Sequence, residues 1–585
     1  MSYHHQLPFG AEIEADGQTR FRIWAPAVKT LSLELEGQAP VAMQPEPEGW
    51  FTARLPAPAG SKYRFHLPDG LAVPDPASRL QDGDVHGWSV VFDPGAHEWH
   101  NTGWRGRPWH EAVIYELHAG LFRGFNGIGD ELQRLRDIGF TAIELMPIND
   151  FPGSRNWGYD GVLPYAPDTA YGTPGQLKTL IDRAHGLGLM VYLDVVYNHF
   201  GPDGAYLHPL AGEKFFDPSK PSPWGAGIAH ERPEVADFFI ENAIYWLNEY
   251  RFDGLRFDAV GAILDLEFPD KMTRRIRAAM EPSRHVHLVM EQEFNRSRHI
   301  GRGKMDAQWA DDTHQALHVL LTGELEGYYA DFKDAAAKLA RCLAEGFAFQ
   351  GEISFKGEPR GEPSAHLPPS AFVIFLQNHD QIGNRAMGER LSVLADPEAL
   401  RAATALLLLS PQIPLMFMGE EDGSVAPFLF FTDHHDELAD QVREGRRREF
   451  AHFAAFSDPA RREQIPDPNA LATFEMCRLD PADHDPETAA HVRRLLALRH
   501  RELFPRLEGS RSLGASALSD AAVIARWLMG DQSELLIVTN FGPAPVAVEP
   551  TGGSLLFESH AGDADQFSNG TLRPRSTVAF LLERT

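Results

Sequence analysis

Residues 190–199 read MVYLDVVYNH, a short apolar run that closes with polar side chains. Runs of this kind recur along the chain, and stretches with the apolar spacing of helices lie between them, such as 176–187 and 233–250. The runs lie at 113–118, 141–146, 190–195, 254–258, 286–291, 305–309, 372–377 and 414–418. Eight alternations of strand and helix predict an α/β fold, and their number favours a closed (β/α)8 TIM barrel over an open doubly wound sheet.

Both flanks of this central region have the pattern of all-β structure. Short strand patterns such as 19–24 and 31–35 alternate with turns rich in Pro, Gly and Asp near the N-terminus, and strand patterns return after 505. Such spacing is typical of small sandwiches. We therefore expect three domains: an immunoglobulin-like β-sandwich of the carbohydrate-binding-module type at 1–105, the barrel at 106–505 and a C-terminal β-sandwich at 506–585.

One loop of the predicted barrel is much longer than the others. Residues 200–232 are rich in Gly and Pro, and a loop of that length in a compact domain is usually functional. We expect it to form a subdomain. The three consecutive arginines at 446–448 are predicted to be the solvated face of a helix.

The charge and cysteine content exclude several classes of protein. With 54 Lys+Arg against 82 Asp+Glu, the net charge of −28 disfavours binding to nucleic acid or to an anionic membrane. Cys342 and Cys477 are too few for a disulfide framework or a four-Cys zinc site, so we expect two unlinked thiols in a cytoplasmic protein. The N-terminus has no secretory pattern, and the most apolar stretch, 402–418, is interrupted by proline.

Polar residues close four of the apolar runs, and these residues are the candidates for a site. Asp194 lies in the third run, Arg256 and Asp258 end the fourth, Glu291 ends the fifth, and Asp380 follows the seventh. In a (β/α)8 barrel the active site is built at the C-terminal ends of the strands, so one rim should collect them. Each residue alone could equally be a helix cap or a surface charge. Their conjunction on one rim favours a site.

These residue types suit retaining glycoside hydrolysis. Arg256 and Asp258 are two apart on a strand and share a face, so the guanidinium can keep the carboxylate ionised. Retaining hydrolysis needs an ionised carboxylate and a protonated one roughly 5–5.5 Å apart. Asp258 suits the nucleophile, and Glu291 suits the acid because the apolar run before it desolvates its carboxyl. Glu293 shares a face with Glu291 and is a rival, although it lies beyond the run.

Other chemistries have little support in the sequence. It contains no G-x-S-x-G elbow, no phosphate-binding G-x-x-x-x-G-K-[ST] loop and no H-E-x-x-H pair. Adjacent histidines on loops are more often exposed than metal-bound, so we predict neither a metal nor a cofactor. Tyr159, after the second run, and Trp224, in the long loop, could stack on sugar rings or could plug the edge of the core.

The strand ends resemble the short conserved regions of the α-amylase superfamily, glycoside hydrolase family 13. The matching segments are DVVYNH at 194–199, GLRFD at 254–258, Glu291 after its run, and NHD at 378–380. By this resemblance Asp258 would be the nucleophile, Glu291 the acid/base, and Asp380 the residue that grips the sugar and stabilises the transition state. The predicted substrate contacts of the same subsite are Tyr159, Asp194, Asn198, His199, Arg256 and His379.

Within the superfamily, the chain is most similar to the maltooligosyltrehalose trehalohydrolase family, over nearly its whole length. The segments that carry this resemblance are WADDTHQALH at 309–318, LTGE at 321–324, NHDQIGNR at 378–385, FMGEE at 417–421 and FFTDH at 430–434. It implies cleavage of the α-1,4 bond next to a terminal trehalose, on a substrate that a separate maltooligosyl trehalose synthase prepares, with no stable complex between the two. Trp224, Asp312, Glu324 and Gln381 are the candidates to recognise the α-1,1 linkage.

Two alternatives stay open from sequence. A glucan branching enzyme would share the barrel and the N-terminal sandwich, but NHDQ stands at 378–381 where branching enzymes typically carry Ser-His-Asp-Glu. A catalytically inert glucan-binding protein would be expected to have lost a carboxylate, whereas Asp258, Glu291 and Asp380 are all present.

Overall fold

The computed structural model describes residues 3–222 and 225–583. Its centre is a closed barrel of eight strands that follow one another around the barrel in chain order, all parallel. The strands are β11 Ile114–Leu117, β12 Ala142–Leu145, β15 Met190–Val195, β18 Gly254–Phe257, β19 His287–Met290, β20 Ala307–Trp309, β23 Phe372–Ile374 and β24 Ile413–Phe417. Each lies within or overlaps one of the eight apolar runs, which confirms the predicted fold class.

The strands are continuously apolar because both of their faces are buried. Ile114, Tyr192 and Val373 belong to a cluster in the barrel interior, while Ile143 and Leu193 pack in the core beneath the surrounding helices. Parallel sheets covered on both faces lose the polar alternation of a half-exposed strand. The sequence therefore shows apolar runs rather than a period of two.

Helices cover the outside of the barrel. They include α1 Gly124–Ile138, α2 Pro174–Gly186, α4 Pro233–Asn248, α5 Phe268–Ala279, α6 Asp311–Thr322, α7 Ala335–Glu345, α10 Pro397–Leu409 and α14 Pro486–Leu498. Local signals fix their starts: Thr173 and Gln176 form a capping box before α2, and Asp396 caps α10. Each of these two helices also has proline at its first position, where no backbone N–H is needed.

The prediction of a helix after every strand is wrong at one place. The connection 291–306 between β19 and β20 contains only the 3-10 turn Ser297–His299. Asn295, Gly301 and Gly303 have positive φ there. Residues with positive φ cannot continue a right-handed helix, so no α-helix forms in this connection.

The long loop 200–232 carries secondary structure of its own. It forms α3 Leu207–Ala211 and an antiparallel hairpin of β16 Phe216–Ser222 and β17 Gly225–Ile228. A second small sheet, β13 Asn149–Asp150 and β14 Leu163–Pro167, frames the loop after β12. Tyr159 lies in that loop. The predicted contact Trp224 lies outside the described residues.

The N-terminal region is a sandwich of two sheets, one ordered β1-β2-β6-β5 and the other β4-β3-β7-β10-β9 with β8 on β7. Phe21 and Phe51 from the first sheet meet Leu33, Tyr63 and Phe65 from the second in one apolar cluster. The strands are β1 Gly10–Ile13, β2 Thr19–Trp24, β3 Ser32–Leu35, β4 Val41–Ala42, β5 Gln44–Pro45, β6 Trp50–Leu55, β7 Lys62–His66, β8 Ala72–Val73, β9 Gln81–Asp82 and β10 Trp88–Val90.

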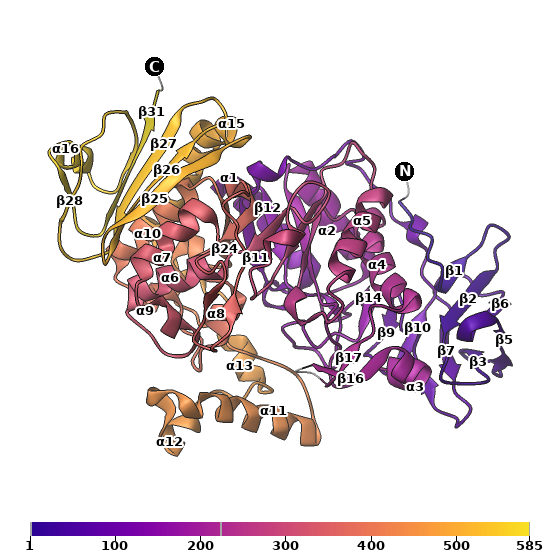
Figure 1. The fold of residues 1–585 in the computed structure, drawn as a ribbon. Helices are drawn as coiled ribbons and strands as arrows, with labels where there is room; N and C mark the ends of the chain where they lie inside the picture. The colour runs from indigo at the N-terminus through magenta and orange to yellow at the C-terminus, as the bar shows by residue number, and fades with distance from the viewer. Residues whose placement is uncertain (1–2, 223–224, 584–585) are drawn as a thin grey trace.

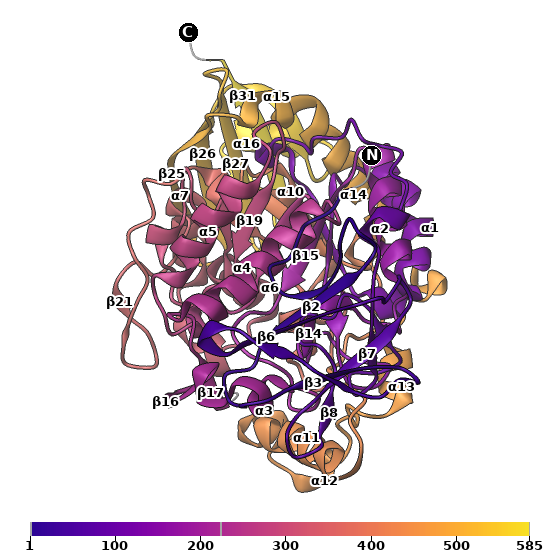
Figure 2. The ribbon, with the colours of Figure 1, turned by 90° about the vertical axis from the view of Figure 1, so that its right-hand side faces the viewer.

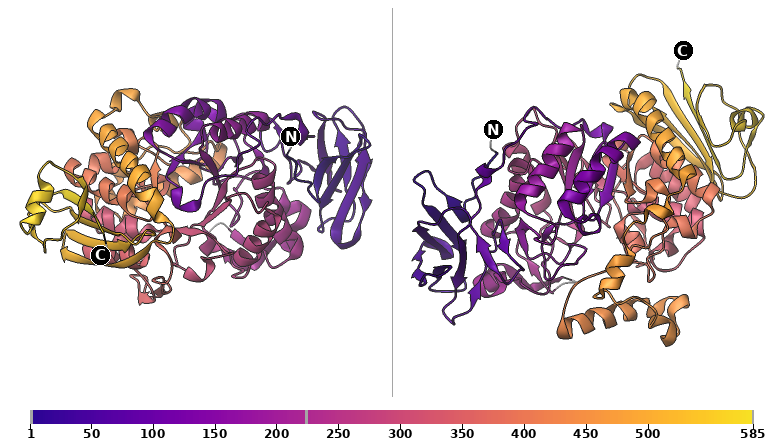
Figure 3. Two further views of the ribbon diagram at one scale, coloured as in Figure 1. Left: turned by 90° about the horizontal axis from the view of Figure 1, so that it is seen from above. Right: turned by 180° about the vertical axis from the view of Figure 1, so that it is seen from behind.

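A five-stranded sheet ordered β25-β26-β27-β31-β29 forms the C-terminal region, at the opposite end of the molecule from the N-terminal sandwich (Figures 1 and 3). Its strands are β25 Arg511–Ser519, β26 Ala522–Leu528, β27 Glu534–Asn540, β29 Ser554–Glu558 and β31 Ser576–Leu582. Trp527 and Ile537 pack into the main core, while Leu536 and Phe580 face Phe567 of α16 Asp563–Ser568. The other C-terminal sheet has only two strands, β28 Val546–Ala547 and β30 Thr571–Leu572. The boundaries at 105 and 505 stay predictions.

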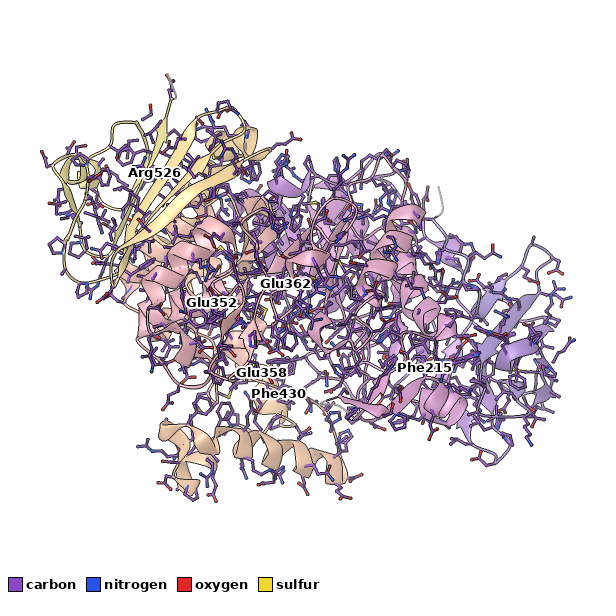
Figure 4. All side chains as sticks on the ribbon, viewed as in Figure 1. Phe215, Glu352, Glu358, Glu362, Phe430 and Arg526 are labelled. Carbon is purple, nitrogen blue, oxygen red and sulfur yellow. The ribbon has the colours of Figure 1, made fainter. Side chains whose placement is uncertain are left out.

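One segment extends partly away from the barrel. Residues 434–476, here called the arm, contain α11 Asp436–Glu449, α12 Pro459–Arg462 and α13 Leu471–Met476. The helices α11 and α12 project below the barrel (Figures 1 and 2), whereas α13 packs against the main core through Phe474. Arg446 of α11 is buried, with its guanidinium over the rings of Phe430 and Phe450, so its prediction as a solvated residue is wrong. Figure 4 labels Phe430 where the arm meets the body. No helix of the described residues is long and apolar enough to cross a membrane.

Candidate active site

Arg256, on β18, is the centre of the predicted site. Its side chain is 1% exposed, and its Nη1 lies 2.6 Å from Asp194 Oδ2 and 2.8 Å from Asp258 Oδ1. Its Nη2 lies 2.8 Å from Glu291 Oε2. One planar guanidinium therefore fixes the carboxylates of three neighbouring strands, and the indole of Trp309 lies beneath it with 4.1 Å from Cζ to the ring centroid.

Asp258 follows β18 directly and reaches the open end of the barrel, with its side chain 12% exposed. Asn198 donates to its Oδ2 at 2.7 Å and to its carbonyl oxygen at 3.0 Å. The next residue, Ala259, has φ of 39°, a left-handed conformation that costs a residue with a Cβ about 1–2 kcal/mol. This turn brings the Ala259 N–H within 2.9 Å of Glu291 Oε2. Local strain is therefore found where the two carboxylates meet.

Glu291 follows β19 and is 20% exposed. Burial raises the pKa of Glu291 to about 8, against the opposing charge of Arg256 and with further contributions from Asp258 and Asp380. Its Oε2 already accepts bonds from Arg256 and Ala259, so the proton belongs on Oε1. The rival Glu293 is 61% exposed and pairs with Lys356 at the surface, which favours Glu291 as the acid.

His379 and Tyr159 extend the network to the opposite side of Asp194. The Tyr159 hydroxyl donates to Asp194 Oδ2 at 2.6 Å and lies 2.8 Å from His379 Nε2, and the two rings stack with centroids 5.2 Å apart. Burial alone would lower the pKa of His379, but the bonded carboxylate of Glu116 raises it to about 9. As an imidazolium, His379 donates through both nitrogens. His199 joins from the other side, bonded to Asn198 and to the carbonyl of Tyr159.

Asp380 lies in the short helix α8 His379–Gly383, not at a strand end. Asn378 and Gln381 form the capping box of this helix, and Asn384 donates to Asp380 Oδ1 at 3.0 Å. The Asp380 side chain is 42% exposed, so it faces the open cleft. The structure thus brings all three predicted catalytic carboxylates to one rim.

The predicted outer contacts do not lie together. Asp312 is fully buried and bonds Arg360, Asn295 and two backbone amides, so the structure does not bring it to the cleft. The side-chain oxygen of Gln381 accepts a bond from the Asn378 N–H in the cap of α8. Its Nε2 lies 3.5 Å from Asp311 Oδ1. Glu324 forms a bidentate pair with Arg385 and bonds His318.

Three acidic residues near the site were missed from sequence. Asp311 begins α6, and burial followed by the charge of Asp380 raises its pKa to about 7. Glu116 of β11 holds His379, and Glu144 is its register partner on β12. Glu144 is buried, and neither of its oxygens has a hydrogen-bond partner among the described residues. The sequence did contain a signal for Glu116 and Glu144, because each is a lone carboxylate inside one of two adjacent apolar runs.

Two cavities are each lined by a residue of the hydrogen-bond network around the site, His199 in one and Asn384 in the other. One, of about 680 Å³, is lined by Asp160, His199 and residues of the long loop including Tyr206 and Phe216. The other, of about 340 Å³, lies between barrel loops and the arm and is lined by residues including Glu324, Tyr328 and Phe453. Both fall within the roughly 300–1,000 Å³ range of ligand pockets. Among the described residues, no group of three His, Cys, Asp or Glu is arranged to hold a metal ion.

The chain is similar to known proteins over almost all of its length. A family model described as the catalytic domain of alpha amylase matches residues 78–217, and one described as a domain of unknown function, DUF3459, matches 510–580. A crystal structure of a Salmonella typhimurium protein, described as a candidate alpha amylase, has a TM-score of 0.93 with 43% identity and covers 99% of this chain and 100% of that one.

Two relatives that match most of the chain carry the same name. The malto-oligosyltrehalose trehalohydrolase of Rhizobium sp. (strain M-11) is 38% identical in an alignment 583 positions long, which covers 94% of this chain and 95% of the relative. The protein of the same name from Saccharolobus solfataricus is 40% identical over 457 residues, 76% of this chain and 80% of the relative. Together with the α-amylase-type barrel and its matching segments, these similarities show that the chain belongs to the malto-oligosyltrehalose trehalohydrolase family.

Proposed function

We propose that this chain is a retaining glycoside hydrolase that cleaves the α-1,4 bond beside the terminal trehalose of maltooligosyl trehalose and releases trehalose. The observation that carries the chemistry is the guanidinium of Arg256, which holds Asp258 and Glu291 side by side while the pKa of Glu291 stays at about 8. One carboxylate is thus available to attack while its neighbour still carries a proton. The family membership supports the choice of substrate.

In the first step, the Asp258 carboxylate attacks the anomeric carbon and displaces the O4 of trehalose. The proton on Glu291 Oε1 moves to that oxygen as the C–O bond breaks, leaving a glycosyl ester on Asp258. In the second step, the Glu291 carboxylate takes a proton from water, whose oxygen attacks the same carbon and releases Asp258. Asp380 holds the sugar hydroxyls at the subsite where charge develops. The imidazolium of His379, bonded to Glu116 and Tyr159, orients Tyr159 beside that subsite.

Hydrolysis can be tested by the identity of the products. Purified enzyme is incubated with maltotriosyl trehalose, maltopentaose or amylose, and the products are separated and linkage-typed. We expect free trehalose and maltotriose from the first substrate. New α-1,6 branches from amylose would instead show a branching enzyme, and no product from any substrate would show an inert glucan-binding protein.

We also propose where the substrate comes from. A maltooligosyl trehalose synthase would convert the reducing end of a glucan to the trehalose end, after which this enzyme acts without a stable complex. Both enzymes together should convert amylose to trehalose, and they should elute separately on gel filtration. The two cysteines, Cys342 and Cys477, are free and buried, which supports the proposed cytoplasmic location. Fractionation of producing cells should recover the activity with a cytoplasmic marker.

A further inference from the structure

A third cavity lies at the other end of the barrel from the proposed active site. It has a volume of about 570 Å³ and is lined by the end of α1 with the turn into β12, by residues 187–188 between α2 and β15, and by α14. α1 packs against both of the other helices (Figure 2). Asp258 and Glu291 follow their strands, whereas these segments precede theirs. The cavity is therefore separate from the carboxylates, and its volume falls within the roughly 300–1,000 Å³ range of ligand pockets.

Three guanidinium groups and one imidazole line this cavity, against a single carboxylate, that of Asp137. Arg107 comes from the segment before β11, and Arg136 comes from the last turn of α1. Arg493 lies in α14, and His500 lies in the π-helical turn after it. The whole chain has a net charge of −28, so the excess of positive charge here is local. Clefts lined by one sign of charge concentrate ligands of the opposite sign.

Asp137 is already occupied by its neighbours on α1. Its two oxygens each accept a bond of 2.9 Å from Gln133 Nε2, and Oδ1 also accepts one of 3.0 Å from Arg136. These bonds lower the pKa of Asp137, and the charge of Arg493 contributes to the shift. Arg493 itself has no carboxylate within ion-pairing distance and no hydrogen bond among the described residues. The protein therefore supplies no contacting partner for this charge.

The backbone of Arg107 is fixed at the cavity, while its guanidinium keeps free donors. The carbonyl oxygen of Arg107 accepts a bond of 2.8 Å from His287 Nε2. Its Nη2 pairs with Glu111 at 2.7 Å, but its Nε has no hydrogen-bond partner among the described residues. A Cβ added at Gly188 would lie 4.0 Å from Arg107 Nη1, so this nitrogen lies beside the turn before β15. The guanidinium is thus placed at the cavity before any ligand binds.

The helix ends around the cavity account for only some of these cations. α1 and α2 both end beside it, and positive charge is favoured near a helix C-terminus. Arg136 lies in the last turn of α1, and His500 Nε2 lies 2.7 Å from the carbonyl oxygen of Gly139, so both fit that role. Within the described part of the chain, neither Arg107 nor Arg493 donates a side-chain hydrogen bond to a carbonyl of these helix ends. Capping of the helices does not explain these two arginines.

We propose that this cavity binds a small organic phosphate, whose phosphate group Arg107 and Arg493 hold. A phosphate ester brings negative charge and several acceptor oxygens, which guanidinium groups bind through paired N–H donors. The cavity is much larger than an inorganic phosphate, and Phe140 and Leu187 offer apolar contact to a carbon skeleton. The expected ligand is therefore a phosphorylated molecule of about the size of a monosaccharide phosphate. It binds away from the glucan and is not a substrate.

Calorimetric titration of the full chain with glucose 6-phosphate, in a buffer without phosphate or sulfate, tests this site. We expect a dissociation constant of about 1 mM or lower at low salt, weaker binding of inorganic phosphate, and weaker binding as salt is added. Arg107→Gln and Arg493→Gln should each raise the dissociation constant about tenfold or more, because each removes bonds to a charged group. Arg494→Gln removes the same charge from the next position of α14, where the guanidinium lies over Phe557 outside the cavity. It should leave the dissociation constant unchanged.

Two further readouts separate this cavity from the proposed active site and from a purely structural role. Trehalose should not displace glucose 6-phosphate, and glucose 6-phosphate should raise the melting temperature of the wild type more than that of Arg493→Gln. If glucose 6-phosphate does not bind, or binds equally to the wild type and both variants, the proposal is wrong and the arginines serve only the fold. Displacement by trehalose would place the ligand in the active site and would also overturn it. Equal affinity for inorganic phosphate would show that no organic part is recognised, which contradicts the proposed ligand.

Discussion

Asp258 and Glu291 occupy equivalent places after adjacent strands, but substitutions of the two residues should stop the reaction at different steps. Asp258→Asn removes the nucleophile, so an activated glycosyl fluoride should leave no ester on the protein. Glu291→Gln keeps the nucleophile but loses the acid and base, so hydrolysis should slow about 10²–10⁴-fold while the glycosyl-enzyme accumulates. Mass spectrometry of the intact protein and of its peptides separates the two results. Label on Glu293 or Asp380 would overturn the assignment of roles.

The raised pKa of Glu291 sets the alkaline limit of the enzyme. The acid acts only when protonated, and its pKa in the folded protein is about 8 rather than the ordinary carboxyl value. The active form therefore predominates below pH 8 and is lost as the pH rises through 8, where kcat/KM should fall. A pH profile of kcat/KM with maltotriosyl trehalose measures this limb. A rate that stays constant well above pH 8 would contradict the assignment of Glu291 as the acid.

Glu116 acts on the site only through His379, so it is a positioning residue. Glu116→Gln keeps the shape but removes the charge that holds the pKa of His379 at about 9. Burial should then leave the imidazole neutral near pH 7, and kcat/KM should drop about tenfold as its bonds to charged groups weaken. Lowering the pH should restore part of the activity by protonating His379 again. A merely structural role for Glu116 would show no such recovery.

At this scale, sequence reasoning succeeds where an apolar run ends in a cluster of polar residues and fails where the run contains a lone carboxylate. Asp194, Arg256, Asp258 and Glu291 were found because a strand end delivers them to the rim. Glu116 and Glu144 were not, because a carboxylate within an apolar run has no visible partner until strands β11 and β12 are paired in register. Asp312 was predicted to contact the substrate because its ion-pair partner, Arg360, is far away in the sequence and could not be foreseen.

Among the elements, the loop after β12 places Tyr159 through a glycine. Gly158 has φ of 103°, and a Cβ there would lie 2.0 Å from the carbonyl oxygen of Pro147. Gly158→Ala should therefore displace Tyr159 from Asp194, lowering kcat, and should cost more than the roughly 1–2 kcal/mol of a left-handed alanine. Urea unfolding and steady-state kinetics measure both effects. Gly17→Ala, with φ of 79° and open space around its Cβ, should cost stability alone.

The predicted elements differ from the structure in their lengths and connections more than in their order. The run 372–377 forms only the short strand β23, because the chain turns into α8 soon after it, with Asn378 as the cap. This helix carries Asp380 at the rim. The missing helix between β19 and β20 has a local cause in Asn295, Gly301 and Gly303. The arm has no core of its own beyond a few residues such as Phe450 and Ile465, so its helices gave little apolar periodicity.

Over the whole molecule, the N-terminal sandwich should be required for a stable barrel. Leu7, Phe9 and Trp99 belong to the barrel's main core, and buried Arg79 bridges Glu12 to Glu249 of the barrel. Removing 1–105 would expose that apolar surface and would take the positive charge of Arg79 away from the buried carboxylate of Glu249. We expect calorimetry of the full chain to show one transition and residues 106–585 alone to unfold at a clearly lower temperature. An unchanged melting temperature for the shorter chain would contradict this dependence.

The buried carboxyl of Glu144, which has no hydrogen-bond partner among the described residues, lowers the stability of the folded protein. Burial raises its pKa well above the ordinary value, and the charges of Glu116 and Asp194 raise it further, so it stands neutral in the barrel. An unpaired buried polar group costs about 1–3 kcal/mol. A thermostabilised variant could therefore begin with Glu144→Leu, and the rise in melting temperature would be offset by a lower kcat if that neutral acid tunes its charged neighbours. Comparing the melting temperature and kcat of Glu144→Leu with those of the wild type would then show how much stability the buried acid costs and how much activity it supports.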